Sequence, residues 1–410
     1  MLKVFLKKWI FLFIIIIFDL IIALRTSIEF FHFFFWFLIS VVTISLAWLT
    51  VEYFGTKLSL TRRSIATIEE GDILEIETVI SNNGFLPIIN FVLEDRLTFA
   101  ISQEREKRFL LEYLGPRSTL NLKYRCLCLR RGRYEIGPFS IYLFDPWGLF
   151  FLKKTLFLYS ELYVYPPTFN IPKFPQLVKG VAPWFGIGTS RVSGDEEEFY
   201  GITEYRRGDP YKKIHWFSTA RKNILIVKQF QHQAFFRATI IFNLNKDKNF
   251  GEGKESVAEY TIKIAASVAK YFIERNVSLG LIAHIGEIVH IPFNKGAEHL
   301  EDIFRALTIA QAESRISLDE LFQEFAPYIP NDSSLIVIML DQDWEFLPAM
   351  LSLKARNISL VPLILIASSF LHPSEKQKII KYPEMELPQG FDFAPIFFSC
   401  GDNLEQDFIK

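Results

Sequence analysis

Residues 237–283 read RATIIFNLNKDKNFGEGKESVAEYTIKIAASVAKYFIERNVSLGLIA, and this stretch decides the fold of the C-terminal half. It opens with a continuous apolar run from Ala238 to Phe242, which is typical of a strand buried on both faces. The run 277–283 has the same character. Between them, residues 255–275 have helical spacing, with an apolar side formed by Ala258, Ile262, Ala265, Ala269 and Phe272. Strand, helix and strand in this order predict two parallel strands joined by a covering helix.

The same alternation continues toward the C-terminus. A helical pattern covers residues 297–310, an apolar strand covers 335–340, a second helix covers 346–356 and a further strand covers 360–366. Strands that alternate with helices favour a mostly parallel sheet with helices on both faces. We therefore predict an α/β doubly wound domain over residues 237–410.

Upstream of this domain the hydrophobic period changes to two. Alternating runs cover residues 73–80, 120–126 and 134–136, and Gly132 and Gly137-Pro138 read as breaks between strands. Such runs with frequent turns predict an antiparallel β-sandwich over residues 57–168. Cys126 and Cys128 lie two positions apart on a predicted strand, so they share a face and are not expected to form a disulfide. Residues 169–236 are predicted to be an ordered connector.

The first 56 residues carry two apolar runs, 9–24 and 30–51, of which the first contains one charge, Asp19. A span needs about 20 apolar residues, so we predict a two-helix transmembrane hairpin over residues 1–56. Asp19 is expected to face the partner helix in a structural role. Positive charges flank both ends of the hairpin at Lys3, Lys7, Lys8, Lys57, Arg62 and Arg63. By the positive-inside rule the remaining chain faces the cytoplasm of the cell; the alternative is that Asp19 prevents insertion of the first run, which puts the soluble part outside.

Overall charge and composition exclude several classes of protein. The 410 residues hold 45 Lys and Arg against 46 Asp and Glu, a net charge of -1, so no global field selects nucleic acid or anionic lipid. Half of the residues are hydrophobic, which excludes a disordered chain. Three cysteines are too few for a disulfide framework.

Sequence motifs for catalysis are incomplete. Residues 251–256 resemble a phosphate-binding loop, but Lys248 stands where the first Gly is needed and Glu255 where Ser or Thr is needed. Residues 186–191 begin like a dinucleotide fingerprint and lack its last Gly. There is no zinc-ligand set and no Gly-x-Ser-x-Gly motif. We therefore expect a chain that is not an enzyme and does not hydrolyse ATP.

The most unusual stretch is residues 195–228, where an acidic run precedes seven Lys and Arg residues and the turn Gly208-Asp209-Pro210. One interpretation is a structural clamp that fixes an irregular loop, formed by Asp209, His215, Trp216 and Arg221. The other is a phosphate or nucleic-acid site with Tyr205 and Trp216 for stacking. The groups of that site would be Arg206, Arg207, Lys212, Lys213 and His215.

This stretch also carries a family resemblance. Phe199-Tyr200-Gly201, Glu204-Tyr205-Arg206-Arg207-Gly208-Asp209-Pro210, Ile214-His215-Trp216, Ala220-Arg221 and Val227-Lys228 resemble the signature of the domain of unknown function 58 family. Supporting similarities are Arg131-Gly132-Arg133-Tyr134, Gly137-Pro138, Asp145-Pro146-Trp147-Gly148-Leu149-Phe150 and Val164-Tyr165-Pro166. The resemblance implies a von Willebrand factor A-like domain after the signature and joint action with MoxR-type AAA+ ATPases as a chaperone-like or assembly factor.

The resemblance also raises a metal question. A von Willebrand A domain with an intact site carries Asp-x-Ser-x-Ser after its first strand and an Asp after a later strand, which hold Mg²⁺. In this chain Asn243 stands at the position of the Asp, and Asn245 and Asp247 stand at the positions of the two Ser residues. Asp341 matches the later acid, and Lys246 adds a positive charge. The lost charge and hydroxyls predict a metal-free fold, so Mg²⁺ is not expected. A degenerate metal-dependent adhesion module using Asn245, Asp247 and Asp341 is the remaining alternative.

The hairpin, the incomplete nucleotide motifs and the family resemblance predict a non-enzymatic, membrane-tethered cytoplasmic scaffold with the lipid bilayer as one partner. The resemblance implies an AAA+ ATPase or other membrane-complex proteins as the further partner. Nucleic acid is not an expected partner. The partner surface or clamp is predicted at Glu204, Arg206, Gly208, Asp209, His215, Trp216, Arg221 and Lys228.

Overall fold

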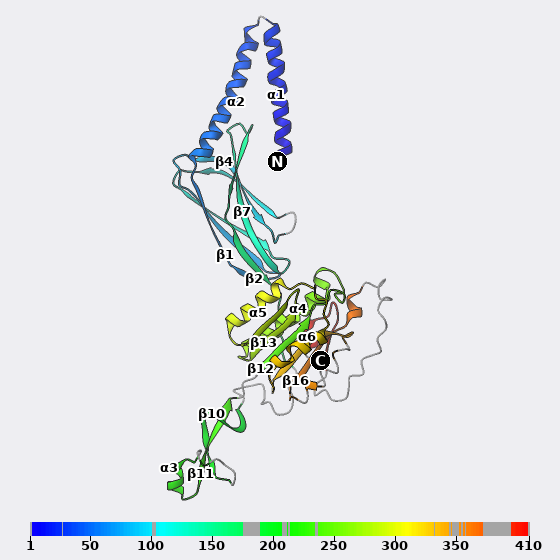
Figure 1. Cartoon of the computed structure of the whole chain (residues 1–410). Coiled ribbons are helices and arrows are strands. Elements are labelled where there is room, and N and C mark those ends of the chain that lie inside the picture. The colour runs from blue at the N-terminus through cyan, green and yellow to red at the C-terminus, as the bar shows by residue number, and fades with distance from the viewer. Residues whose placement is uncertain are drawn as a thin grey trace. The chain divides into compact units, whose positions relative to one another are not determined.

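In the computed structural model the chain forms two compact units, Met1–Pro166 and Pro167–Lys410 (Figure 1). The structure describes residues 2–26, 28–100, 104–174, 189–206, 211, 214–233, 237–331, 333–343, 346, 352–353, 356, 358–371 and 395–408.

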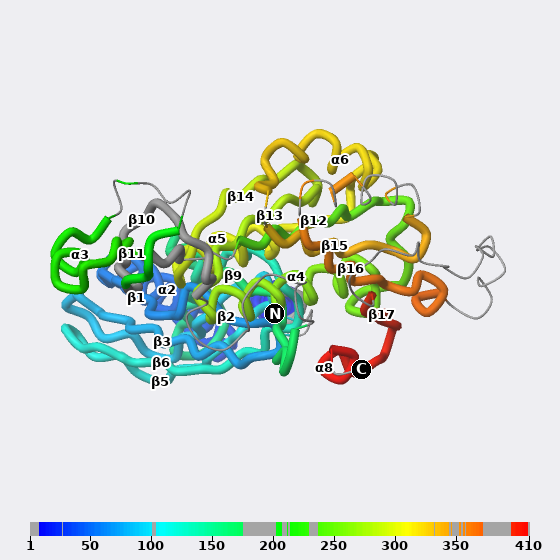
Figure 2. Tube along the Cα trace, turned by 90° about the horizontal axis from the view of Figure 1, so that it is seen from below, coloured from blue at the N-terminus to red at the C-terminus, as the bar shows by residue number. Residues whose placement is uncertain are grey.

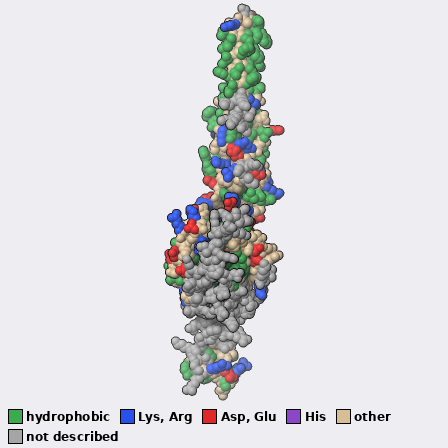
Figure 3. All heavy atoms as spheres, turned by 90° about the vertical axis from the view of Figure 1, so that its right-hand side faces the viewer, with side chains coloured by type: hydrophobic (Ala, Val, Ile, Leu, Met, Phe, Trp, Pro, Cys, Tyr) green, Lys and Arg blue, Asp and Glu red, His purple; other side chains and the backbone are tan. Residues whose placement is uncertain are grey.

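Two helices begin the first unit, α1 over Leu2–Arg25 and α2 over Glu29–Gly55, and they pack against each other. Both helices carry exposed hydrophobic side chains, such as Phe11 on α1 and Phe33 on α2. Hydrophobic side chains gather at the helical end of the face seen in Figure 3. Within the described part of the chain, α2 is the one helix long and apolar enough to cross a membrane. Asp19 of α1 is buried. The two predicted helices are therefore present, and one of them has the length and composition of a span.

The rest of the first unit is built from two β-sheets. The smaller sheet has the order β1-β3-β6, with bounds Leu58–Ser64, Ile73–Asn82 and Thr119–Leu127. The larger sheet has the order β2-β9-β7-β4-β5, and β8 pairs with β7. Its bounds are β2 Thr67–Glu69, β4 Ile88–Leu97, β5 Glu106–Leu114, β7 Gly132–Phe144, β8 Phe151–Leu156 and β9 Ser160–Tyr165. Side chains of both sheets meet in shared hydrophobic clusters, although β2 pairs with β9 in parallel, so the region is not wholly antiparallel.

Gly137-Pro138 does not break a strand as the sequence pattern predicted. Strand β7 continues through it, pairing with β9 over Gly132–Ile136 and with β8 over Phe139–Phe144. Gly137 has a φ of +121°, and a Cβ there would collide with the carbonyl oxygen of Leu158. The dipeptide therefore marks the point at which one long strand changes its partner.

Cys126 and Cys128 form no disulfide, which the sequence predicted, and both are buried. They lie in one hydrophobic cluster of the β-rich region. Burial raises the pKa of the Cys128 thiol to about 12 and also raises the pKa of Cys126.

A buried ion pair ties the two sheets together. Arg62 of β1 approaches Asp95 of β4 at 2.6 Å, and both side chains are 0% exposed. The Tyr124 hydroxyl of β6 donates to the same carboxylate, and Arg62 also donates to the Ile136 carbonyl at 2.8 Å and lies over the ring of Phe139. Arg62 is thus an interior group, and of the positive charges predicted to follow the hairpin, Lys57 and Arg63 remain exposed.

The second unit contains a six-stranded sheet of order β14-β13-β12-β15-β16-β17. The bounds are β12 Arg237–Asn243, β13 Ser278–His284, β14 Ile288–Asn294, β15 Ser334–Leu340, β16 Ser359–Leu365 and β17 Ile396–Phe398. All neighbours pair in parallel except the edge strand β14. The predicted mostly parallel α/β sheet is confirmed.

Helices cover both faces of this sheet. Helices α4, Val257–Glu274, and α5, Ala297–Ile309, lie on one face and α6, Leu318–Phe325, lies on the other (Figure 2). Helix α6 was not predicted from the sequence, although Ser317 and Glu320 form a capping box at its start. Most of the predicted helix 346–356 lies outside the described residues. A short helix α8, Leu404–Asp407, follows β17.

The predicted connector also contains regular structure. A long strand β10, Thr189–Glu204, pairs antiparallel with β11, Ile226–Gln233, and the short helix α3, Trp216–Lys222, lies between them in sequence. The signature stretch is therefore part of a β-hairpin with a helical insertion.

Candidate functional site

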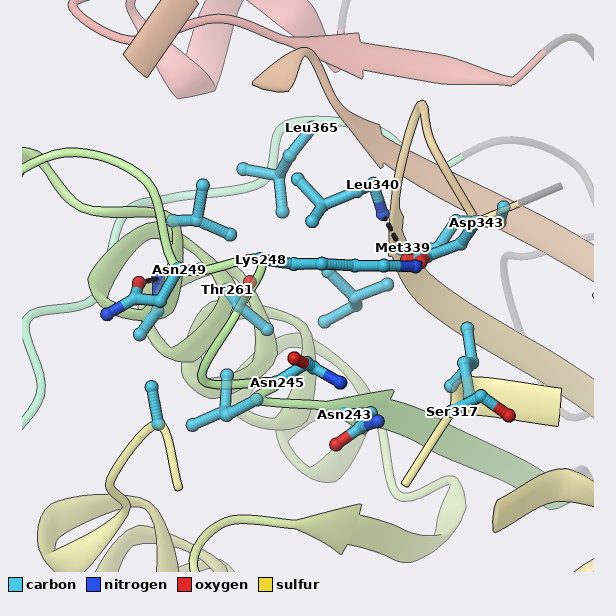
Figure 4. Close-up of a pocket in the computed structure, with 16 residues that line it drawn as sticks. Asn243, Asn245, Lys248, Asn249, Thr261, Ser317, Met339, Leu340, Asp343 and Leu365 are labelled. Atoms are coloured by element: carbon cyan, nitrogen blue, oxygen red, sulfur yellow. Dashed lines mark hydrogen bonds and ion pairs between the residues drawn. The ribbon is translucent and has the colours of Figure 1, made fainter. Parts of the chain in front are cut away.

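The first candidate site is a crevice at the carboxyl ends of β12 and β15. The chain leaves β12 toward β13 on one side, whereas β15 pairs on the other side, so the strand order reverses between these two strands. Open α/β sheets bind their ligands at such a switch point. A pocket of about 20 Å³ lies here (Figure 4), which is the space of one or two water molecules.

The two asparagines of the predicted metal-binding loop form hydrogen bonds with a neighbouring loop. The side-chain amides of Asn243 and Asn245 donate to the Ile316 carbonyl at 2.6 and 3.3 Å. The Asn245 side-chain oxygen accepts the backbone N–H of Asp247 at 2.8 Å, and Asp247 itself is exposed. Only one of these oxygens, Oδ1 of Asn243, is buried without a partner among the described residues.

A lysine ammonium lies in this crevice and pairs with a carboxylate. Lys248 extends across the pocket, and its Nζ lies 2.5 Å from Oδ1 of Asp343 (Figure 4). The other oxygen of Asp343 accepts the backbone N–H of Leu340 at 2.9 Å. Lys246, which was predicted to supply the local positive charge, is exposed instead. Only the course of the loop after β12 shows that Lys248 turns inward.

Asp341 does not join these groups as a ligand. Its Oδ1 accepts the backbone N–H of Ala367 at 3.2 Å. Burial, and secondarily the neighbouring Asp343 carboxylate, raise the pKa of Asp341. Within the part of the chain that the structure describes, no three His, Cys, Asp or Glu side chains gather to hold a metal. The crevice residues fit an internal ammonium group better than a divalent cation.

The raised pKa gives a pH prediction for Asp341→Asn. Because folding favours the protonated carboxyl, the ionised form lowers stability, and this loss grows as the pH rises through the raised pKa. Asparagine keeps the acceptor for Ala367 and removes the charge. We expect the variant to be more stable than the wild type at pH 7, and we expect this difference to vanish below pH 3.8, the ordinary pKa.

Thermal unfolding of both proteins across this pH range is the measurement. Asp302→Asn, at an exposed position of α5, is the matched control and should show no such trend. A variant that is less stable at pH 7, or a wild type that Mg²⁺ stabilises while the variant does not respond, would contradict our description of the crevice.

The second candidate site is the signature segment on β10, α3 and β11. Glu204 pairs with Ile226 and Lys228 with Ile202 across the hairpin. His215 donates its backbone N–H to the Ile226 carbonyl at 2.8 Å, and its ring Nδ1 accepts the Ser218 N–H at 3.2 Å. His215 is therefore the N-cap of α3 and fixes this helix to the hairpin. Gly208, Asp209, Arg207, Lys212 and Lys213 lie outside the described residues.

Helix α3 presents two aromatic side chains, which we name the α3 aromatic pair. Trp216 is 67% exposed and Phe217 is 76% exposed. Trp216 was predicted as a site residue from the sequence, and Phe217 was not. The one signal that could have indicated Phe217 is its position next to Trp216. Nearby in sequence, Tyr205 and Tyr211 stack with ring centroids 5.7 Å apart. Exposed aromatic side chains of this size are typical of protein interfaces.

Of the four residues predicted to form the clamp, the structure describes His215, Trp216 and Arg221. His215 fixes the segment as a cap, whereas Trp216 and Arg221 are exposed. Arg221 has no ion-pair partner within that part of the chain. Arg206 is also exposed, and Lys228 is half-buried. The segment therefore displays side chains at least as much as it clamps a loop.

Comparison with known proteins places both candidate sites in one family domain. Residues 202–355 match the family described as "Protein of unknown function DUF58". This range contains α3, β11 and the crevice strands β12 and β15, so the resemblance noted from the signature is confirmed over these residues.

A distant homologue is the uncharacterized protein YeaD of Bacillus subtilis, which is 26% identical over 267 residues. The alignment covers 62% of this chain and 64% of that protein.

Similarities to solved structures are weak. The CARDB domain of a Pyrococcus furiosus protein matches at a TM-score of 0.21 and 14% identity, covering 27% of this chain and 93% of that one. A β-glucosidase from Listeria innocua matches at a TM-score of 0.17 and 12% identity, covering 27% of this chain and 16% of that one.

Proposed function

We propose that this chain, which carries a DUF58 family domain over residues 202–355, is a non-enzymatic scaffold that tethers a protein partner to a membrane. The observation that carries the proposal is the α3 aromatic pair. Trp216 and Phe217 are largely exposed, and they stand on a helix that His215 caps. Interfaces derive most of their affinity from a few such aromatic anchors. The partner class that we propose is a MoxR-type AAA+ ATPase that assembles or matures protein complexes.

Two finer names for the fold belong to this proposal. The two sheets that share hydrophobic clusters support a β-sandwich between the membrane helices and the rest of the chain. The strand order β14-β13-β12-β15-β16-β17, with β14 antiparallel, supports a von Willebrand factor A-like domain. The Lys248–Asp343 pair in its crevice supports partner binding without a metal.

The membrane part of the proposal is a two-span hairpin with the soluble regions in the cytoplasm. The apolar helix α2 and the packing of α1 against it support the hairpin. Exposed Lys57 and Arg63 follow α2, whereas Arg25 and Glu29 offset each other at the hairpin turn. This asymmetry supports a cytoplasmic orientation.

The test is crosslinking of the tagged full chain in its native membranes, followed by identification of the captured material. We expect an AAA+ ATPase among the captured proteins. Capture of nucleic acid, together with oligonucleotide binding that weakens steeply with salt, would contradict the proposal and support a nucleic-acid site around Arg206.

A further inference from the structure

The loop between β7 and β8, residues 145–150, is closed by one buried carboxylate. Asp145 is 2% exposed. Its Oδ1 accepts the backbone N–H of Phe150 at 2.6 Å, and its Oδ2 accepts the N–H of Trp147 at 3.1 Å. The same Oδ2 accepts the hydroxyl of Ser45 at 2.9 Å. Three donors therefore satisfy the charge, and the third of them comes from α2.

Further contacts hold this loop against both helices of the hairpin. The indole N–H of Trp9 on α1 donates to the Leu149 carbonyl, and its ring meets Phe150 edge-on at 4.8 Å. At the other end of β8, the Lys154 ammonium donates to the carbonyls of Tyr53 and Thr56 at 3.3 and 3.1 Å, where α2 ends. Strand β8 thus runs beside the last turns of α2. The loop contacts α2 at Ser45, ten residues before the end of the helix at Gly55.

The rise of the two helices gives the depth of the loop in the bilayer. Ser45 follows the start of α2 at Glu29 by a distance of about 24 Å at 1.5 Å per residue. Trp9 precedes the end of α1 at Arg25 by about the same distance. The hydrocarbon core of a bilayer is about 30 Å thick. If α2 enters the core at its start, a loop bonded to Ser45 lies about 6 Å from the inner boundary of that core, on its hydrocarbon side.

The chemistry of the loop fits this depth. Residues 146–150 read PWGLF and contain no charge, and Trp147 is 53% exposed. Tryptophan favours the boundary between headgroups and hydrocarbon. A groove of about 400 Å³ opens beside the loop, and it is lined by Trp9, Ile10, Phe13, Ile14, Val42 and Phe150. An apolar groove at this level suits acyl chains better than water.

We infer that the β7–β8 loop is immersed in the bilayer at the boundary between headgroups and acyl chains, with Trp147 as its lipid-facing anchor. The β-rich region is then held to the membrane by a third contact, besides α1 and α2. This inference rests on the proposed membrane span of α2.

The test measures the depth of spin labels on single cysteines in the full chain reconstituted into phosphatidylcholine and phosphatidylglycerol nanodiscs. The native cysteines are first replaced by alanine or serine. Labels are placed at Trp147→Cys, at Phe37→Cys in α2, and at Phe157→Cys just after the opposite end of β8. Phe157 is the matched control because it is aromatic and 79% exposed. Accessibility to oxygen reports lipid, and accessibility to a water-soluble nickel chelate reports water.

We expect the labels at positions 147 and 37 to have a several-fold higher ratio of oxygen to nickel accessibility than the label at 157. Immersion of the label at 37 with an accessible label at 147 would overturn the inference and leave the membrane span intact. A label at 37 that the nickel chelate reaches freely would overturn both.

Discussion

Replacing Arg62 by methionine is expected to destabilise the β-rich region by about 3–5 kcal/mol. The substitution keeps an apolar stem of similar length but leaves the Asp95 carboxylate buried without its cation. The Ile136 carbonyl also loses its donor from Arg62. The substitution removes one partner of a buried pair and leaves the other in place. The remaining charge lies between two packed sheets without access to water, and its burial lowers the free energy of unfolding.

Hydrogen exchange, measured peptide by peptide on the full chain, separates this effect from the stability of the second unit. Amides of β4 and β6 that exchange through opening of this region should exchange about two to four orders of magnitude faster in the variant. Arg125→Met is the matched control, because Arg125 pairs with Glu75 where both side chains are exposed. That pair is worth at most about 1 kcal/mol. Equal effects of the two substitutions would show that the Arg62–Asp95 pair does not hold the sheets together.

The second large effect is expected at the α3 aromatic pair. Trp216→Ala should weaken capture of the protein partner by at least about 30-fold, because a central aromatic anchor contributes 2 kcal/mol or more to an interface. The substitution should not unfold the segment, because Trp216 is exposed in the unbound chain. The measurement is a titration of the nanodisc-embedded chain with the partner identified by crosslinking.

Two further variants distinguish display from clamping. Phe157→Ala removes an equally exposed aromatic side chain of the first unit and should leave capture unchanged. Arg221→Ala tests the clamp: if this variant keeps both its fold and its partner, Arg221 has neither role. Undiminished binding by Trp216→Ala would remove the α3 aromatic pair as the partner surface.

The elements that could be predicted before folding is considered are those whose hydrophobic period is strong and local. The apolar strands β12, β13, β15 and β16 and the helices α4 and α5 all lie where the periodicity predicts them. Their burial requires a repeated pattern of apolar residues in the chain. That pattern can be recognised without knowing which elements pack against them. The family signature was legible for a related reason, since residue types at fixed spacing need no tertiary context.

Which side chains meet could be learned from the folded chain alone. Gly137-Pro138 looks like a strand end, yet pairing with β8 and β9 on the two sides of the dipeptide carries β7 through it. Lys248 and Asp343 are far apart in sequence, and the parallel sheet brings their loops to one edge. Arg62 reads as a flanking charge of the hairpin until its approach to Asp95 shows that it is an interior group. Each of these outcomes depends on contacts between distant segments, which a local pattern of residue types does not encode.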